Sequence, residues 1–200
     1  RSSAASDVYK RQRMDDVIFV SEDAKKNFSK LFGIDKGRVI YNIIDQRAIC
    51  KRSKAVSSMP RHRTFTFVNV GSLKEIKRQD RIIETAALLK ARGYDADFWL
   101  IGKGIWEERL KAQATALNVS DSVHFLGFQS NPYPYVAAAD VFLMTSDSEG
   151  FPLVVAEAMC LGKAVISTRI TGPMEMLGNG RYGILTGFCL LYTSDAADDL

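Results

Sequence analysis

The sequence predicts an α/β fold built on a doubly wound parallel sheet. Short apolar runs alternate with helical stretches along most of the chain, as in 64–71 (TFTFVNVG), which is followed by a stripe of Ile82, Ile83, Ala86 and Leu89 at helical spacing. The runs are apolar at nearly every position, which is typical of parallel strands covered by helices on both faces. No apolar run approaches the ~18 residues that a membrane-spanning helix needs.

The predicted elements follow one another regularly. Near the front, strands at 17–21 and 38–42 flank a helix with Ser21 as its N-cap and Gly33 just beyond its end. Residues 46–63 are basic and aperiodic, which indicates a linker or exposed loop. Further strands are predicted at 64–71, 96–102, 122–127, 141–146, 164–168 and 183–186, with helices at 78–93, 106–118, within 131–139, after 150 and at 173–177.

The two ends of the chain resemble a single translated DNA element. Residues 2–12 (SSAASDVYKRQ), back-translated with permitted codons, give on the complementary strand the sequence CLLYTSDAAD found from Cys189 onward. The element resembles the adapter of a transposase-based sequencing-library method. We therefore expect residues 1–12 and 189–200 to be foreign to the protein, and the remainder to be a fragment cut at both ends.

Composition excludes several classes of protein. The chain carries 27 basic and 23 acidic residues, a net charge of +4, which suits an anionic small ligand or a membrane surface but is too weak to indicate nucleic-acid binding. Outside the tails, Cys50 and Cys160 are too far apart in sequence to suggest a disulfide framework, and they fit a reducing cytosol. No His, Asp and Glu residues have metal-ligand spacing, so we expect no tightly bound metal.

From about Val17 to Leu185 the chain resembles the retaining family 4 (group 1) glycosyltransferases of the GT-B architecture. The matching segments are IFVSEDAKKNF, VIYNIID, FVNVGSLKEIKRQDRIIETAALL, DFWLIGKG, VHFLGFQSNPYPYVAAADVFLMTS, EGFPLVVAEAMCLGKAVIST and GPMEML. The resemblance implies that residues 13–45 end an N-terminal domain and cross over, that 46–63 form a linker, and that 64–188 form a truncated, Rossmann-like donor-binding domain. Ile43 replaces the glycine usual in the crossover, between the matching Asn42 and Asp45.

The resemblance also implies the site residues. Catalytic roles fall on Glu149 and Lys77, and donor contacts on Gly71, Ser72, Arg78, Gly102, Lys103, Gly127, Phe128, Gly150, Phe151, Pro152, Leu153 and Glu157.

The segment EGFPLVVAE has chemistry that suits a nucleotide sugar. The start of a helix at Gly150 and Phe151 offers backbone N–H groups and the positive end of the helix dipole to anionic oxygens. Glutamates accept hydrogen bonds from hydroxyls, and the family places Glu149 on the donor sugar and Glu157 on the ribose. Charge–dipole stabilisation of the helix start is the alternative. It accounts for Glu149 but not for Glu157, which lies inside an otherwise apolar helix.

The loop at 71–80 (GSLKEIKRQD) matches the family's diphosphate-binding loop. Gly71 and the lysine position at Lys77 match, whereas Ser72 stands where the family has arginine, so one cation is missing unless Lys74 or Arg78 substitutes for it. Lys77 would neutralise the departing diphosphate, which is electrostatic stabilisation of the transition state. The alternative is an ordinary solvated basic loop.

Two further strand ends match weaker parts of the family pattern. In IGKGI (101–105) the glycines permit close approach of a ligand to the backbone near Gly102 and Lys103, although a simple turn is equally compatible. Gly127 and Phe128 fall where the family holds the nucleobase. His124, inside a strand, is expected to be structural.

The resemblance predicts an enzyme that moves a sugar from a nucleotide diphosphate to a glycan or lipid-linked acceptor, typical of bacterial surface-polysaccharide synthesis. No metal is required in the family's mechanism, and the missing first domain would supply acceptor contacts and any peripheral membrane contact of a cytoplasmic enzyme. The fragment alone is expected to be inactive. Two alternatives stay open: a nucleotide-sugar epimerase of related fold, which the EGFP block disfavours, and a non-catalytic nucleotide-binding module, which only Ser72 favours.

Overall fold

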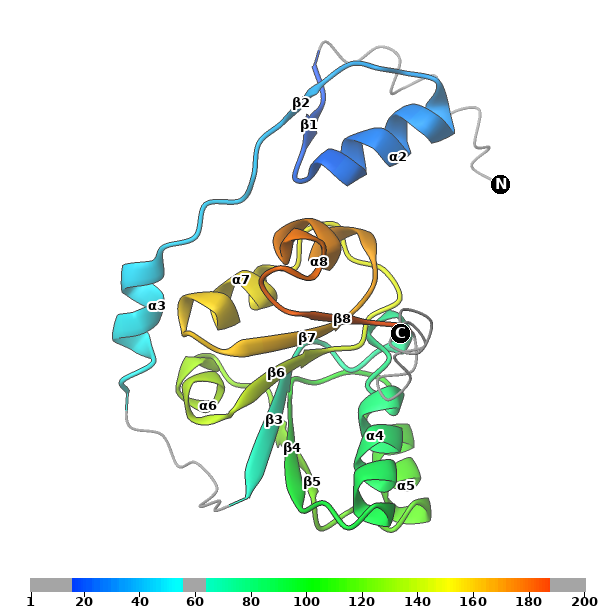
Figure 1. The fold of residues 1–200 in the computed structure, drawn as a ribbon, viewed down its shortest axis with the longest axis vertical. Helices are drawn as coiled ribbons and strands as arrows, with labels where there is room; N and C mark the ends of the chain where they lie inside the picture. Colours follow the sequence, from blue (N-terminus) through cyan, green and yellow to red (C-terminus); the bar gives the residue numbers. More distant parts are fainter. Residues whose placement is uncertain (1–15, 56–63, 188–200) are drawn as a thin grey trace, which may run out of the picture. The chain divides into compact units, whose positions relative to one another are not determined.

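The computed structural model describes residues 16–55 and 64–187. The expectation that 1–12 and 189–200 are adapter-derived lies outside these ranges. The chain divides into two compact units, one ending at Ile43 and the other beginning at Ile44. Each unit is described by itself (Figure 1).

The first unit contains one helix and two short parallel strands. β1 (Ile18–Phe19) pairs with β2 (Arg38–Val39), and α2 (Glu22–Phe32) connects them. The predicted caps of α2 are confirmed: Ser21 Oγ accepts from the Ala24 N–H at 3.1 Å, and Gly33 has a left-handed φ of 63°. The Phe28 ring packs against both Phe19 and Phe32, with centroids 5.2 and 4.9 Å away. Aromatic packing therefore holds the helix on the strands.

The second unit is a six-stranded parallel sheet, as the sequence predicts. Its strands are β3 (Phe65–Val70), β4 (Ala96–Ile101), β5 (Val123–Gly127), β6 (Val141–Met144), β7 (Ala164–Thr168) and β8 (Ile184–Thr186). They lie in the order β5-β4-β3-β6-β7-β8, so the direction of winding reverses between β3 and β6. In open parallel sheets, ligands bind beyond the carboxyl ends of the strands at such a reversal.

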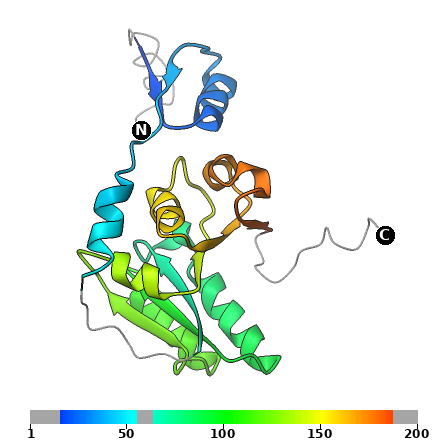
Figure 2. The same cartoon turned by 60° about the vertical axis from the view of Figure 1, so that its left-hand side comes forward.

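Helices cover both faces of this sheet (Figures 1 and 2). They are α4 (Asp80–Ala91), α5 (Glu107–Ala116), α6 (Tyr133–Ala138), α7 (Leu153–Cys160) and α8 (Thr171–Met176), with 3-10 turns at η1 (Glu75–Lys77) and η2 (Gly178–Gly180). Along β4, Trp99 and Ile101 join the core under α6, α7 and α8, whereas Phe98 and Leu100 join the core under α4 and α5. Alternate residues are therefore buried on opposite faces, which explains why the strands are apolar at most positions.

The expectation of a linker or loop at 46–63 is wrong for its first part, because α3 (Gln46–Arg52) is a helix. Asp45 caps it, its carboxylate accepting from the Ala48 N–H at 2.9 Å, and Ile49 is buried. The helix packs against α6 and α7. With only seven residues and a single buried side chain, α3 gives too little periodicity to be recognised among its basic residues.

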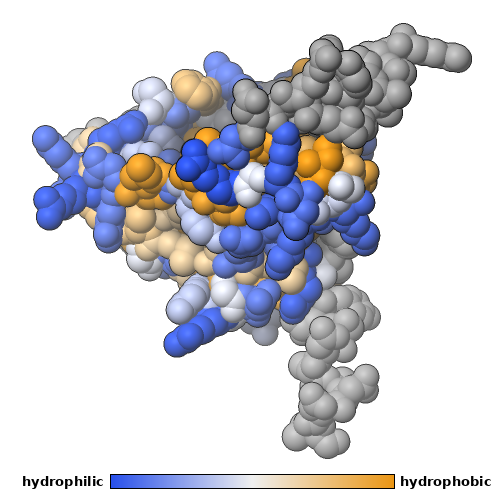
Figure 3. All heavy atoms as spheres, turned by 90° about the horizontal axis from the view of Figure 1, so that it is seen from above, coloured by the Kyte–Doolittle hydropathy of each residue, from blue (hydrophilic) through white to orange (hydrophobic). Residues whose placement is uncertain are grey.

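Within the described ranges, no helix is both long and apolar enough to cross a membrane. The face seen in Figure 3 carries apolar side chains among hydrophilic ones. In the first unit, Leu31 and Ile43 are among the most exposed large apolar residues, at 76% and 96%.

Candidate functional site

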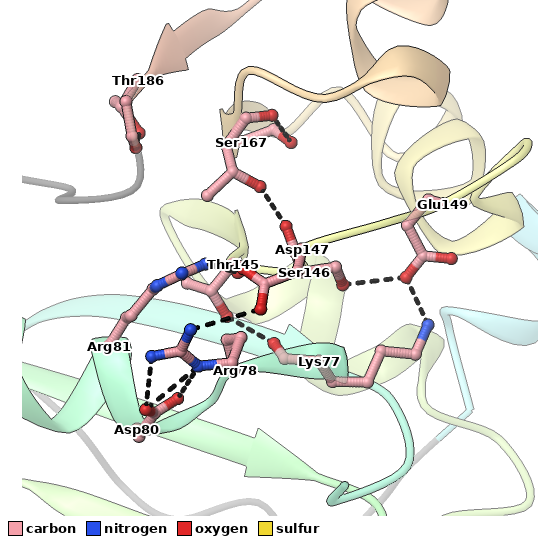
Figure 4. A network of polar contacts seen from close by, with 12 residues as sticks. Lys77, Arg78, Asp80, Arg81, Thr145, Ser146, Asp147, Glu149, Ser167 and Thr186 are labelled. Atoms are coloured by element: carbon pink, nitrogen blue, oxygen red, sulfur yellow. Dashed lines mark hydrogen bonds and ion pairs between the residues drawn. The ribbon is translucent and has the colours of Figure 1, made fainter. Parts of the chain in front are cut away.

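The two residues predicted to be catalytic meet at the reversal between β3 and β6. Lys77 lies in the loop after β3, and its Nζ forms an ion pair with Oε1 of Glu149, which lies in the loop after β6 (Figure 4). Ser146 Oγ donates to the same carboxylate oxygen at 2.8 Å. The Lys77 and Glu149 side chains are 23% and 15% exposed. The pair is thus half-buried, with part of each side chain exposed.

Further hydrogen bonds fasten these two loops to each other. Thr145 Oγ1 donates to the carbonyl oxygen of Lys77 at 2.8 Å, and the Asp147 N–H donates to the carbonyl of Ile76 at 2.9 Å. Arg81, on α4, donates to the carbonyl of Thr145 at 2.9 Å. The position of the lysine relative to the glutamate is therefore fixed by the backbone of both loops.

Arg78 contributes to this fastening. Its guanidinium bonds to both carboxylate oxygens of Asp80 at 2.9–3.1 Å and to Asp147 at 3.2 Å. The bonds to Asp80 above all raise the pKa of Arg78. Burial alone would raise the pKa of Asp147, but hydrogen bonds from Arg81 and Arg78 outweigh it and lower that pKa. We expected Arg78 to contact the nucleotide sugar. In the structure its N–H groups instead form hydrogen bonds to these two carboxylates.

A pocket of about 300 Å³ lies beyond the carboxyl ends of β3, β4 and β5. It brings together the predicted donor-binding residues Gly71, Ser72, Gly102, Lys103 and Phe128. Gly127, whose φ is 65°, is the last residue of β5 and directly precedes Phe128. The predicted site residues in the loops after β3, β4 and β5, together with the loop after β6 that carries Glu149, therefore lie at the same edge of the sheet.

The glycines of the IGKGI segment serve the packing of two loops. A Cβ on Gly102 would lie 1.9 Å from the carbonyl oxygen of Gly71, and one on Gly104 would lie 2.0 Å from that of Leu73. The Leu73 N–H donates to the Lys103 carbonyl at 3.0 Å across the same contact. The sequence alone suggests a ligand as the partner in this close approach. The structure shows that the partner is the backbone of residues 71–73.

Gln79 is a residue that the sequence analysis missed. It is completely buried at the start of α4, and its Nε2 donates to the carbonyl of Ser72 at 3.1 Å. This bond supports the backbone that lines the pocket. Nothing in the sequence pattern separates Gln79 from the polar residues around it, because only the loop geometry brings it under Ser72.

Glu157 has a different partner from Glu149. The Tyr133 hydroxyl, on α6, donates to Glu157 Oε1 at 3.0 Å, and burial, followed by this hydrogen bond, raises the pKa of Tyr133. The described contacts do not place Glu157 beside Lys77 or in the lining of the pocket. Tyr133 is therefore a polar neighbour of this glutamate, which the sequence did not indicate.

The segment between the two glutamates packs against α8. The Gly172 N–H donates to the Glu149 carbonyl at 3.3 Å, and a Cβ on Gly172 would lie 2.7 Å from the carbonyl oxygen of Gly150. Pro152 is buried as the N-cap residue of α7, Phe151 is half-buried, and Leu153 begins the helix with 44% exposure. This packing sets where the start of α7 lies.

Two other sequence expectations can be compared with the structure. His124 Nε2 lies 3.0 Å from Asp97 Oδ1, which confirms a structural histidine. Cys50 and Cys160, distant in sequence, are neighbours, the Cys50 thiol donating to the Cys160 carbonyl at 3.7 Å. In the part of the chain that the structure describes, no group of three or more His, Cys, Asp or Glu could hold a metal ion.

The strand order, the covering helices and the pocket beyond the strand ends define a Rossmann-like α/β domain of the GT-B type. The family described as "Glycosyl transferases group 1" matches residues 52–197. The chain belongs to this family.

Curated relatives agree with this assignment. The chain is 32% identical over 165 residues to the N-acetylgalactosamine-N,N'-diacetylbacillosaminyl-diphospho-undecaprenol 4-alpha-N-acetylgalactosaminyltransferase of Campylobacter jejuni, covering 82% of this chain and 43% of that protein. It is 35% identical over 118 residues to the lipopolysaccharide core biosynthesis glycosyltransferase LpsE of Rhizobium meliloti, covering 59% of this chain and 34% of that protein. The chain spans less than half the length of these relatives.

Solved structures share the fold. Anabaena HepE, crystallised in complex with UDP, superposes with a TM-score of 0.76 at 24% identity, covering 92% of this chain and 54% of that chain. At this level of identity the likeness establishes the fold.

Proposed function

We propose that this chain is the donor-binding part of a retaining glycosyltransferase that takes its sugar from a nucleoside diphosphate. The observation that carries the proposal is the Lys77–Glu149 pair at the reversal of the sheet. One cation and one carboxylate there offer complementary groups to the two halves of such a donor. The lysine suits the diphosphate, and the carboxylate suits the sugar hydroxyls.

The pocket supplies the remaining complementarity. Gly71 and Ser72 present loop backbone, Lys103 a second cation, and the 67% exposed Phe128 an aromatic face for a base. Ser72 stands in place of the usual arginine, and Arg78 is engaged with Asp80 and Asp147. The cations left in these loops include Lys77, Lys103 and the exposed Lys74. Glu157 is the group that we assign to the ribose hydroxyls.

In the reaction, the bond from the anomeric carbon to the diphosphate oxygen breaks, and a bond from that carbon to the acceptor oxygen forms on the same face. The acceptor proton passes to a phosphate oxygen of the donor, so this half of the cleft needs no general base. Lys77 balances the negative charge that gathers on the leaving diphosphate. The charge of Lys77 takes the place that a metal would have, and we expect donor binding to be unchanged by a chelator.

The activities for which the relatives are named support a narrower proposal. The Campylobacter protein is named as a transferase acting on a diphospho-undecaprenol-linked sugar, and the Rhizobium protein as one of lipopolysaccharide core biosynthesis. We propose a glycan or lipid-linked acceptor in bacterial surface-polysaccharide synthesis. The complete enzyme would work on the cytoplasmic side of the membrane, where the other domain would hold the acceptor.

The test is isothermal titration of the chain with UDP, GDP, ADP and TDP. We expect one of them to bind, and Glu157→Ala to weaken that binding by about 1–3 kcal/mol because ribose hydrogen bonds are lost. A folded chain that binds none of the four would refute the proposal. A preference among them would identify the base.

A further inference from the structure

Arg52, the last residue of α3, contacts the segment that leads into α6 in three ways. Its guanidinium donates to the carbonyl of Ser130 at 3.0 Å, and its own carbonyl accepts from the side-chain amide of Asn131 at 2.9 Å. The guanidinium also lies over the ring of Tyr133, 4.8 Å from the centroid. One residue thus fixes both the path of this segment and the position of a ring within it.

Tyr133 extends this arrangement to α7. The residue is 9% exposed, and its hydroxyl donates to Glu157 Oε1 at 3.0 Å. The other carboxylate oxygen, Oε2, has no hydrogen-bond partner among residues 16–55 and 64–187. A carboxylate held at one oxygen keeps the acceptor sites of the other for a ligand. The chain of contacts therefore runs from Arg52 through Tyr133 to the glutamate that we assign to the ribose.

We infer that Arg52 is a positioning residue for the nucleoside half of the donor, acting through Tyr133 on Glu157. The inference rests on the proposed function. Arg52 holds the segment after Phe128, which lines the pocket, and it also orients the tyrosine that holds Glu157. A planar guanidinium can stack on the ring and donate to Ser130 at the same time, whereas an ammonium group has no planar face to stack.

The contacts of Arg52 are distinct from those that hold the proposed diphosphate-binding residues. Lys77 and Glu149 are fastened by the loops after β3 and β6, and none of those contacts involves α3. Removal of the Arg52 guanidinium should therefore weaken the grip on the ribose while leaving the contacts to the diphosphate intact.

The experiment compares the ribonucleoside diphosphate that binds tightest in the panel with its 2′-deoxy counterpart, by isothermal titration of the full chain. In the original protein the ribo form should bind more tightly. Arg52→Met, which keeps the aliphatic stem, should weaken the ribo form about tenfold and the deoxy form much less, so that the preference shrinks. Arg52→Lys should restore only part of it. Lys51→Met, which removes an exposed cation from the same helix, is the matched control and should change neither affinity.

Two further variants separate positioning from general damage. Tyr133→Phe keeps the ring and removes the hydroxyl, so it should reproduce the loss of ribose preference even if Arg52→Met folds poorly. In a Glu157→Gln background, Arg52→Met should have little further effect, because the residue through which it acts is already altered. If the original chain binds no nucleotide, the proposed function itself fails. If the chain binds but Arg52→Met weakens both forms equally, or neither, the positioning role is overturned.

Discussion

The contact between the loops after β3 and β4 allows a steric prediction that does not depend on any ligand. Gly104 has an ordinary backbone conformation, yet a Cβ built on it would lie 2.0 Å from the Leu73 carbonyl oxygen and 2.5 and 2.7 Å from the Leu73 carbonyl carbon and nitrogen. Because Leu73 is 1% exposed and belongs to the core, its backbone cannot move aside freely. We expect Gly104→Ala to separate the two loops.

The magnitude follows from what the separation breaks. The Leu73 N–H donates to the Lys103 carbonyl at 3.0 Å, and the Trp106 N–H donates to the Leu73 carbonyl at 3.1 Å. A backbone hydrogen bond contributes about 0.5–1.5 kcal/mol, and a buried leucine side chain about 1.5–3 kcal/mol, of which a shift forfeits a part. Gly104→Ala should lower the free energy of unfolding by about 2–4 kcal/mol.

Urea unfolding followed by tryptophan fluorescence measures this directly. Both tryptophans, Trp99 and Trp106, lie in the unit that contains the two loops. Gly71→Ala is the matched control, because a Cβ there would meet nothing closer than 3.9 Å. The steric reasoning is refuted if Gly104→Ala unfolds within about 0.5 kcal/mol of the original chain, or if Gly71→Ala costs as much.

Three other outcomes are expected. Lys77→Met should weaken binding of the tightest-binding nucleoside diphosphate of the panel about tenfold or more, and binding of the corresponding monophosphate less, because in the proposed function Lys77 pairs with the diphosphate. Titration calorimetry measures both affinities, and equal losses would contradict the proposed role. Asp147→Asn should destabilise the second unit in urea at pH 7. Folding lowers the pKa of Asp147 below 3.8, so the ionised carboxylate stabilises the fold fully above pH 3.8, and this stabilisation is lost as the pH falls through the lower folded pKa. The urea unfolding curves of Asp147→Asn and of the unsubstituted chain should therefore converge in acid and stay apart near neutral pH. Phe98→Ala, which removes a ring that is 1% exposed and stacked 4.9 Å from Phe67, should cost about 3–5 kcal/mol by the same urea assay, whereas Phe128→Ala, at an exposed ring, should cost little.

The sheet and its covering helices could be predicted because local signals determine them. Strands buried on both faces are apolar at most positions, and Ser21 and Gly33 mark helix ends by their own chemistry. The helix α3 was not predicted because it packs on α6 and α7, which are distant in sequence. Only the folded unit shows that Ile49 is buried in that contact.

The arrangement of the candidate site could be predicted only in part. The rule that ligands bind beyond strand ends, together with the family resemblance, selected Lys77, Glu149 and the pocket residues before their contacts were known. The residues that hold them in place were not predictable, since Gln79 under Ser72 and Tyr133 beside Glu157 depend on contacts between distant segments. Arg78 shows the converse, because a basic residue in the correct loop is engaged by Asp80 and Asp147.

The docking of α3 bears on how domains of this kind can be exchanged between related enzymes. A graft beginning at the first sheet strand, near residue 64, would leave behind Ile49, Cys50 and Arg52 and uncover the surfaces of α6 and α7 that they contact. A graft beginning at Ile44 would carry this short helix along and keep those surfaces covered. Chimeric transferases joined at the earlier point should therefore keep α6 and α7 better ordered than those joined at the later one.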